Sequence, residues 1–183
     1  MKELITGILM CIAALTAKAQ VLTSETIKNV HNEMTSKANS EYVYNVDYTG
    51  NDITTMYVYK KEYAENDVLL LKSYLKYDYT YAEDGILTNK VAYRWDDLLN
   101  SWACTACYDY AVADGKYMIE YSRYNATANC FEQPVDRMVY SLIPFSGVNT
   151  VSSYHREGAS SPFELIYKME VMDEPVLYAE QHK

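Results

Sequence analysis

Glycine and proline are scarce in this chain of 183 residues, with six and four copies respectively. Because 49% of the residues are hydrophobic and 22% are charged, the composition excludes a disordered or low-complexity protein and leaves ample material for a core. Basic residues are also in deficit, since 16 Lys and Arg stand against 25 Asp and Glu and leave a formal charge of −9. Nucleic acid is therefore excluded as a partner, because its phosphates require a basic surface.

Motifs of familiar catalytic and cofactor-binding sites are missing as well. The sequence has no G-x-S-x-G turn, no glycine-rich phosphate loop and no D-x-D-x-D-G calcium loop, and it contains only three histidines. We therefore expect a protein without catalytic residues, without a cofactor and without a metal site.

Only the N-terminus has a long apolar run, and residues Met1–Ala19 have the three parts of a secretory signal peptide. Lys2 supplies the positive charge, Leu4–Ala17 is apolar, and Ala17-Lys18-Ala19 is an A-x-A cleavage site before Gln20. The alternative is an uncleaved interfacial anchor, because the run is too short to span a bilayer. We expect an exported protein, either periplasmic, associated with the outer membrane or secreted, with no membrane span after cleavage.

The rest of the chain divides into a helical segment, residues 20–40, and a β domain, residues 41–183. A helix is predicted over Thr23–Lys37, with Thr23 or Ser24 as its cap and Glu25 near the positive end of its dipole. Its apolar residues lie at helical spacing on one narrow stripe: Ile27, Val30 and Met34.

From Glu41 onward, the hydrophobic period changes to two, and turn residues recur at short intervals. This pattern predicts a mainly β fold: an antiparallel hairpin meander, either a single curled sheet or a sheet closed as a sandwich or barrel, with one short N-terminal helix. The expected strands are Tyr42–Val46, Ile53–Tyr59, Tyr74–Tyr81, Ile86–Trp95, Trp102–Val112, Tyr117–Tyr124, Arg137–Ile143, Val148–His155 and Phe163–Val171.

An internal repeat of about thirty residues lies around positions 77–131. Tyr77–Gly85 recurs as Tyr108–Gly115, and each copy is followed by a strand and a six-residue loop. The loops are predicted to place aromatic residues opposite each other across neighbouring strands. The expected cross-strand pairs are Trp95 with Trp102, and Tyr124 with Phe131.

These repeats are similar to those of a known family. The residues that carry the resemblance are Lys90, Tyr93-Arg94-Trp95, Asn100, Trp102, Tyr117, Ile119-Glu120-Tyr121, Arg123-Tyr124, Phe131, Arg137 and Val139-Tyr140. Over Tyr74–Ser141 the chain resembles a family of short exported Bacteroides proteins with Tyr/Trp-rich hairpin repeats, known only as a domain of unknown function. The resemblance implies a Bacteroidetes envelope or secreted setting and no particular reaction.

Tyrosine is abundant, with 20 copies against three Phe and two Trp. Regular alternation would place Tyr93 and Trp95 on one face of the sheet with Trp102, Tyr108 and Tyr110, and polar residues on the other. A sheet packed on one side only suits tyrosine, whose ring can be buried while its hydroxyl stays in water.

The cysteine pattern includes one C-x-x-C, Cys104 to Cys107, within an expected strand. Residues three apart in a regular strand point to opposite faces, so we expect no bond between these two cysteines. An exported protein can form disulfides. The expected pair is Cys104 with Cys130, with Cys107 left free.

The strongest candidate site surrounds the loop at Asp96. Aromatic rings that can stack on sugar rings lie beside carboxylates that can accept hydrogen bonds from hydroxyls. The candidate residues are Tyr93, Arg94, Trp95, Asp96, Asp97 and Trp102. We predict an exported, non-catalytic binding or interaction module with a glycan as ligand. An envelope scaffold or protein–protein interaction domain is the main alternative, with an envelope protein as partner, and a carbohydrate-active hydrolase is the third.

Overall fold

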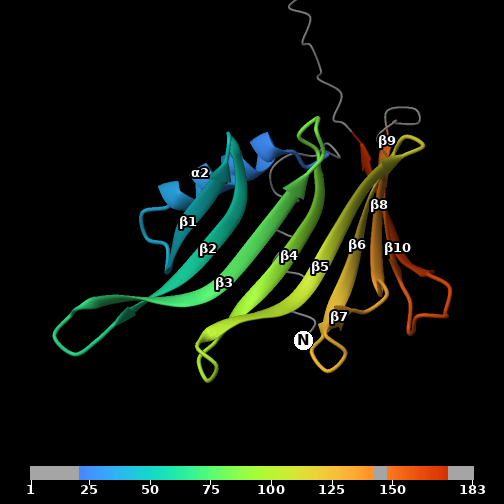
Figure 1. Cartoon of the computed structure of the whole chain (residues 1–183). Coiled ribbons are helices and arrows are strands. Elements are labelled where there is room, and N and C mark those ends of the chain that lie inside the picture. Colours follow the sequence, from blue (N-terminus) through green and yellow to red (C-terminus); the bar gives the residue numbers. More distant parts are fainter. Residues whose placement is uncertain (1–20, 142–147, 173–183) are drawn as a thin grey trace, which may run out of the picture.

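The computed structural model describes residues 21–141 and 148–172, which form one helix and one antiparallel sheet (Figure 1). The strands follow one another across the sheet in the order β1-β2-β3-β4-β5-β6-β8-β9-β10, and the short β7 pairs with β6. Their bounds are β1 Tyr42–Thr49, β2 Asp52–Tyr63, β3 Leu69–Tyr81, β4 Leu87–Asp96, β5 Ser101–Ala113, β6 Lys116–Asn125, β7 Cys130–Phe131, β8 Asp136–Ser141, β9 Val148–His155 and β10 Glu164–Met172.

The predicted meander is confirmed, and of the two forms considered the single curled sheet is the one observed. The sheet is not closed, since β1 and β10 lie at opposite ends of the strand order. Most strands begin and end within two residues of the expected bounds, but β1 and β2 end three and four residues late and β3 begins five residues early, at Leu69. The expected strand end at Ile143 lies outside the described residues. The predicted signal peptide, Met1–Ala19, lies outside the described residues.

The predicted helix is α2, Ser24–Ser36. Thr23 caps it in a capping box, because its hydroxyl accepts a hydrogen bond from the Thr26 amide at 3.2 Å and its own amide donates to the Thr26 hydroxyl at 3.4 Å. Ile27 is the buried residue of the helix. The rest of the predicted stripe is only partly buried, so α2 lies on the sheet through a narrow contact.

Backbone hydrogen bonds at the start of α2 connect it to the sheet. The Ser24 amide donates to the carbonyl of Gly85, and the Leu87 amide donates to the carbonyl of Leu22, each at 2.9 Å. Gly85, at the end of the β3–β4 turn, has a φ of 79°, a left-handed conformation that favours glycine. The Asp-Gly sequence at this turn therefore reverses the chain, and its glycine carbonyl also accepts a hydrogen bond from the first residue of the helix.

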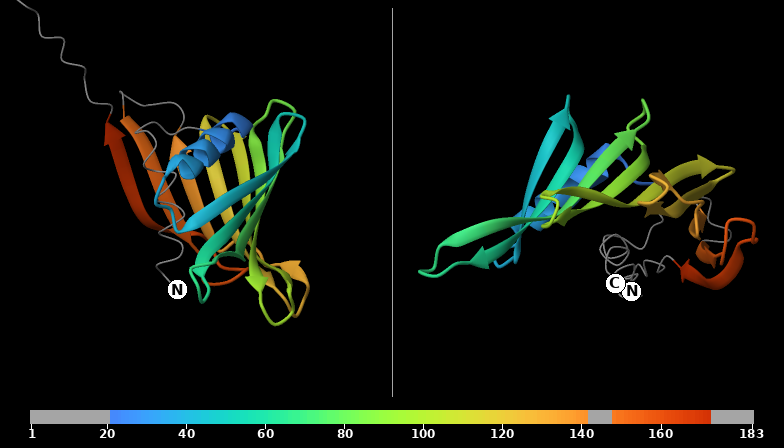
Figure 2. Two further views of the ribbon diagram at one scale, coloured as in Figure 1. Left: turned by 90° about the vertical axis from the view of Figure 1, so that its left-hand side faces the viewer. Right: turned by 60° about the horizontal axis from the view of Figure 1, so that its bottom comes forward.

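The sheet curves into an open trough, and α2 lies inside it (Figure 2). We call the side of the sheet toward α2 the helix face and the other side the open face. The main core is on the helix face, where seven buried residues pack together: Leu22, Ile27, Ile53, Met56, Leu87, Tyr110 and Tyr117. Two of these seven residues are tyrosines, and five of the eight partly buried residues that pack against them are tyrosines as well, so tyrosine is the main aromatic residue of this core.

A β-bulge in β5 changes which side chains share a face. Tyr93 pairs with Cys104, but the next pair is Ala92 with Ala106, so Thr105 is an extra residue without a partner in the register. The Thr105 hydroxyl donates to the carbonyl of Ala92 at 2.9 Å and thereby holds the bulge.

This bulge corrects two expectations. Trp95 and Trp102 lie on the open face, whereas Tyr108 and Tyr110, beyond the bulge, lie on the helix face. The prediction of one shared face is therefore wrong. Cys104 and Cys107 lie on the same face, not on opposite faces, because the extra residue between them reverses the alternation.

A second bulge, in β10, corrects the regular alternation expected there. Leu165 pairs with Tyr154 and Tyr167 pairs with Ser153, so Ile166 is the extra residue. Leu165 and Tyr167 consequently belong to different faces of the sheet, and both are exposed.

Candidate binding surface

A row of aromatic rings crosses the open face from β2 to β5. The rings of Trp95 and Trp102 meet edge to face with centroids 5.0 Å apart, which confirms the predicted pair. The Trp102 ring also lies 6.3 Å from that of Tyr57, and Tyr57 stacks on Tyr59 at 6.4 Å. All four side chains are half-buried, so part of each ring is accessible from the open face. We call Tyr57, Tyr59, Trp95 and Trp102 the aromatic row.

The loop next to the aromatic row is held by its own first residue. The Asp96 carboxylate accepts hydrogen bonds from the amides of Leu98 and Leu99 at 2.9 and 3.0 Å. Asn100 closes the loop with a φ of 50°, which asparagine tolerates better than most residues. Asp96 therefore stabilises the turn, and one of its oxygens is already committed to the backbone.

The second copy of the repeat builds the same loop. Asn125 accepts from the amides of Thr127 and Ala128 at 3.1 and 3.0 Å, and Asn129 has a φ of 51°. The rings of Tyr124 and Phe131 meet at 5.4 Å, again edge to face, as predicted. Each copy of the repeat thus contains the same three features of a hairpin loop. These are a first residue whose side chain accepts hydrogen bonds from the loop amides, an asparagine with positive φ at the end, and an aromatic pair across the two strands.

Charged and hydroxyl groups lie beside the aromatic row on β2, β3 and β4. The Lys76 ammonium contacts the Asp78 carboxylate at 2.9 Å and lies 3.9 Å from the centre of the Tyr93 ring. The Thr55 hydroxyl donates to the other oxygen of Asp78 at 2.9 Å. Burial, followed by the nearby charge of Asp78, raises the pKa of Tyr93 to about 12, so its hydroxyl remains a hydrogen-bond donor at neutral pH.

Tyr57 joins the aromatic row to an acidic group at the β1 edge. Its hydroxyl donates to the Asp47 carboxylate at 3.0 Å, and this hydrogen bond is the main reason that the pKa of Tyr57 is raised. Asp47 and Asp78 both lie opposite Thr55 in the register, and Lys76 lies opposite Tyr57, so the acidic groups and the ammonium gather next to the Tyr57 end of the row.

The structure brings together only part of the predicted site. Tyr93, Trp95 and Trp102 share the open face. Arg94 points to the helix face, where its guanidinium lies 5.9 Å from the Tyr74 ring. Asp96 is engaged in the loop, and Asp97 is exposed beyond it.

Sequence reasoning missed the β2 and β3 contributions to this surface, which are Tyr57, Tyr59, Lys76, Asp78 and, from β1, Asp47. Tyr57 and Tyr59 do alternate within an expected strand, which was the available signal. The contact of Tyr57 with Trp102 spans two intervening strands, so it depends on the curvature of the sheet and not on any local pattern.

The expected disulfide between Cys104 and Cys130 is not formed, since Cys104, Cys107 and Cys130 are all free thiols. Cys104 pairs with Tyr93 in the middle of the sheet, whereas Cys130 pairs with Asn125 at the exposed end of β6. Burial raises the pKa of both the Cys104 and the Cys107 thiol, which lowers the thiolate fraction and hence their reactivity.

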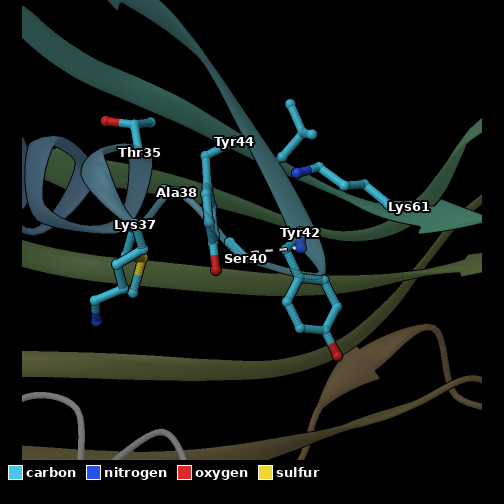
Figure 3. A pocket seen from close by; sticks show the side chains of 9 residues that line it. Thr35, Lys37, Ala38, Ser40, Tyr42, Tyr44 and Lys61 are labelled. Carbon is cyan, nitrogen blue, oxygen red and sulfur yellow. Dashed lines mark hydrogen bonds between the residues drawn. The ribbon is translucent and has the colours of Figure 1, made fainter. Parts of the chain in front are cut away.

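Two concave regions lie apart from the aromatic row. A pocket of about 300 Å³ lies between the end of α2 and β1, where Ser40 accepts a hydrogen bond from the Tyr42 amide at 3.1 Å (Figure 3). Lys37 and Lys61 are among the residues that line it. A groove of about 400 Å³ follows β6 and β8 on the open face, with Phe163 under the guanidinium of Arg137. The linings of these two regions contain Asp114 as their one carboxylate.

Within the residues that the structure describes, no cluster of three or more His, Cys, Asp or Glu side chains is suited to hold a metal ion. The same residues include no helix that is long and apolar enough to cross a membrane.

Comparison with known proteins identifies a family but no activity. Residues 1–142 match the model of a family of unknown function, DUF3836, and no curated protein matches the chain. A protein of unknown function from Bacteroides fragilis has a similar fold, with a TM-score of 0.59 and 17% identity over 72% of this chain and 92% of its own.

Two crystal structures of DUF3836 proteins match smaller parts. The one from Parabacteroides distasonis covers 55% of this chain and 90% of its own at 24% identity, with a TM-score of 0.48. The one from Bacteroides vulgatus covers 50% and 89% at 21% identity, with a TM-score of 0.45.

Proposed function

The chain belongs to the DUF3836 family of unknown function, and from this premise we propose that it is an exported, non-catalytic module that binds a glycan on its open face. The observation that carries this proposal is the aromatic row. Flat rings that are held rigidly and partly exposed present apolar faces on which the C–H groups of a sugar ring can stack. Neighbouring members of the row are 5.0 to 6.4 Å apart, so together they form a continuous strip and not isolated surface residues.

The polar groups beside the strip supply hydrogen bonds in both directions. Asp47 and Asp78 accept, while Lys76 and the Tyr93 hydroxyl donate. Sugar hydroxyls can both donate and accept, so a surface with both types of group at its margins suits them. Asp47 already binds the Tyr57 hydroxyl, and Asp78 already binds Thr55 and Lys76, so the positions of these carboxylates are set before a ligand arrives.

A glycan array probed with the purified protein tests the proposal, followed by calorimetric titration of the best oligosaccharide. Trp102→Ala and Tyr57→Ala should each weaken binding at least tenfold. Phe131→Ala is the matched control, because Phe131 holds the same hairpin position in the second repeat but lies outside the aromatic row. Equal losses in Trp102→Ala and Phe131→Ala, or no glycan bound by the wild type, would contradict the proposal.

An interaction domain for an envelope protein is the second candidate, because large apolar side chains are exposed at one end of the sheet. Leu98 and Leu99 are 96% and 72% exposed at the tip of the β4–β5 loop. Leu69, Leu70 and Leu71 are also exposed, at the start of β3. The wild type should capture an envelope protein from a membrane extract, and Leu98→Ser with Leu99→Ser should abolish this capture while leaving glycan binding intact; no capture by the wild type would contradict this candidate.

A carbohydrate-active hydrolase is the third candidate. It would need two carboxylates facing one cleft. Asp47 and Asp78 do lie on the same face, on either side of Thr55 in the register. Both are engaged in hydrogen bonds, which favours a role in holding the surface over a role in proton transfer.

A further inference from the structure

Lys90 is the one buried charged residue among those the structure describes. It lies on β4, opposite Tyr79 of β3 and Tyr108 of β5, and only 7% of it is exposed. Its ammonium lies 4.0 Å from the centre of the Tyr108 ring and 5.6 Å from that of Tyr77. Lys90 thus extends into the trough on the helix face, between tyrosine rings from both neighbouring strands.

The described residues give this ammonium no carboxylate and no hydrogen-bond acceptor. Burial is the only cause that shifts the pKa of Lys90, which it lowers to about 8, so the side chain is still mostly charged at neutral pH. Two aromatic faces offset part of the cost of its desolvation. A buried charge with no opposite charge is nevertheless unfavourable, in a protein that has 25 acidic residues available elsewhere.

The surroundings of Lys90 are apolar and lined by small residues. Ala92 follows it on the same face, and Ala106 lies opposite Ala92 on β5. Both alanines are buried, and burial raises the pKa of Tyr79 and Tyr108, which marks this part of the trough as poor in water. The main contacts of α2 with the sheet are to β1 and β2, so β4 and β5 lie beyond them.

We propose that Lys90 anchors a second ligand site, in the trough on the helix face, which takes an apolar molecule that ends in a carboxylate. The carboxylate would supply the missing charge, and the apolar body would lie along the tyrosines and alanines of β3, β4 and β5. An uncharged apolar ligand would leave the ammonium unpaired, and a neutral sugar would find few polar partners there. The site is independent of the aromatic row, because it is on the opposite face.

Titration with dodecanoate and with dodecanol, both below their aggregation limits, tests this site. The wild type should bind dodecanoate at least tenfold more tightly than dodecanol, because only the carboxylate can pair with Lys90. Lys90→Met keeps an unbranched side chain but has no charge, so it should bind the two ligands about equally, whereas Lys90→Arg should retain the preference.

Lys76→Met is the matched control. Lys76 also lies over a tyrosine ring, at 3.9 Å from Tyr93, but on the open face and with Asp78 as its partner. Its replacement should leave dodecanoate binding unchanged. The proposal is overturned if the wild type binds neither ligand, if it binds both equally, or if Lys90→Met keeps the preference for dodecanoate. If Lys90→Met does not fold, the comparison of the two ligands in the wild type still decides.

Discussion

The two faces of the sheet use lysine and tyrosine in opposite ways. On the open face, Lys76 has a carboxylate partner, and the Tyr57 hydroxyl donates to the Asp47 carboxylate. On the helix face, Lys90 lies among tyrosine rings without a carboxylate in the described residues, and the tyrosines are packed into a core. Residue type therefore does not determine the role here. Register does, since each side chain's partners follow from the face on which it lies.

One inserted residue sets this division in β5. Before the Thr105 bulge, the strand presents Trp102 to the open face, and after it the strand presents Tyr108 and Tyr110 to the core. A regular strand would put all three on one face. The bulge thus separates a surface suited to binding from the residues that hold the fold.

Tyr117→Ala is expected to have the largest effect on stability. Tyr117 is 2% exposed, stacks with Tyr110 at 6.2 Å, and its hydroxyl accepts a hydrogen bond from the Leu22 amide at 3.3 Å. Loss of this ring should lower the free energy of unfolding by about 3–5 kcal/mol, measured by denaturant melts. A loss below about 1 kcal/mol would show that the helix face is not the main core.

Deletion of Thr105 should have the next largest effect, because it would remove the bulge and force part of β5 onto the wrong face. We expect a loss of about 2–3 kcal/mol, with a red shift of tryptophan emission as Trp102 leaves Trp95. Thr105→Ala is the control, since it removes only the hydroxyl that donates to Ala92 and keeps the extra residue. Wild-type stability and emission after the deletion would mean that the bulge does not set the faces.

The pH dependence of stability should distinguish Lys90 from the exposed lysines. The pKa of Lys90 is lowered from 10.5 to about 8 on folding, so the unfolded chain holds the proton more tightly between these two pH values. Raising the pH through this window therefore stabilises the wild type, by about 1 kcal/mol per pH unit.

Lys90→Met buries no charge, so it should be more stable than the wild type at neutral pH and should lack this gain on raising the pH. The difference in free energy of unfolding between the two proteins should therefore be largest below pH 8 and should shrink toward pH 10. Melts of both proteins at matched pH values measure this difference, in which the titration of the tyrosines cancels. An advantage that stays constant or grows with pH would contradict the environment described for Lys90.

The coupling of Trp95 with Trp102 should be the smallest of these effects. The rings are half-buried and 5.0 Å apart, so the two alanine substitutions should be non-additive by about 0.5–1.5 kcal/mol. The Tyr124 and Phe131 pair should show a smaller coupling, because Phe131 is 38% exposed. Additive losses at Trp95 and Trp102 would refute the pairing as an energetic contact.

Much of the fold could be predicted from local patterns. Alternation and turn residues predicted the strands, and the spacing in the repeat predicted both aromatic pairs, because a hairpin loop is determined by the residues within it. The bulges at Thr105 and Ile166 could not be predicted, since an extra residue leaves no mark in composition. This is why the faces of Tyr108, Cys104 and Cys107 were misassigned.

Only the part of the candidate site that lies on the β4–β5 hairpin could be predicted from the sequence. Tyr93, Trp95 and Trp102 are close in sequence and meet in the structure. Tyr57 reaches the same surface from β2 across two other strands, through a curvature that depends on the whole sheet. The hydrogen bonds from the turn to one oxygen of Asp96 could not be read from composition either, because they depend on how the loop folds.

Tryptophan fluorescence gives the most direct test of the central proposal, because the chain has only two tryptophans and both belong to the aromatic row. A glycan that stacks on this surface should change the emission saturably, at the same concentrations at which calorimetry detects heat. The change should persist in Phe131→Ala and disappear in Trp102→Ala. Binding that produces heat without any change in tryptophan emission would place the ligand elsewhere and contradict the proposed surface.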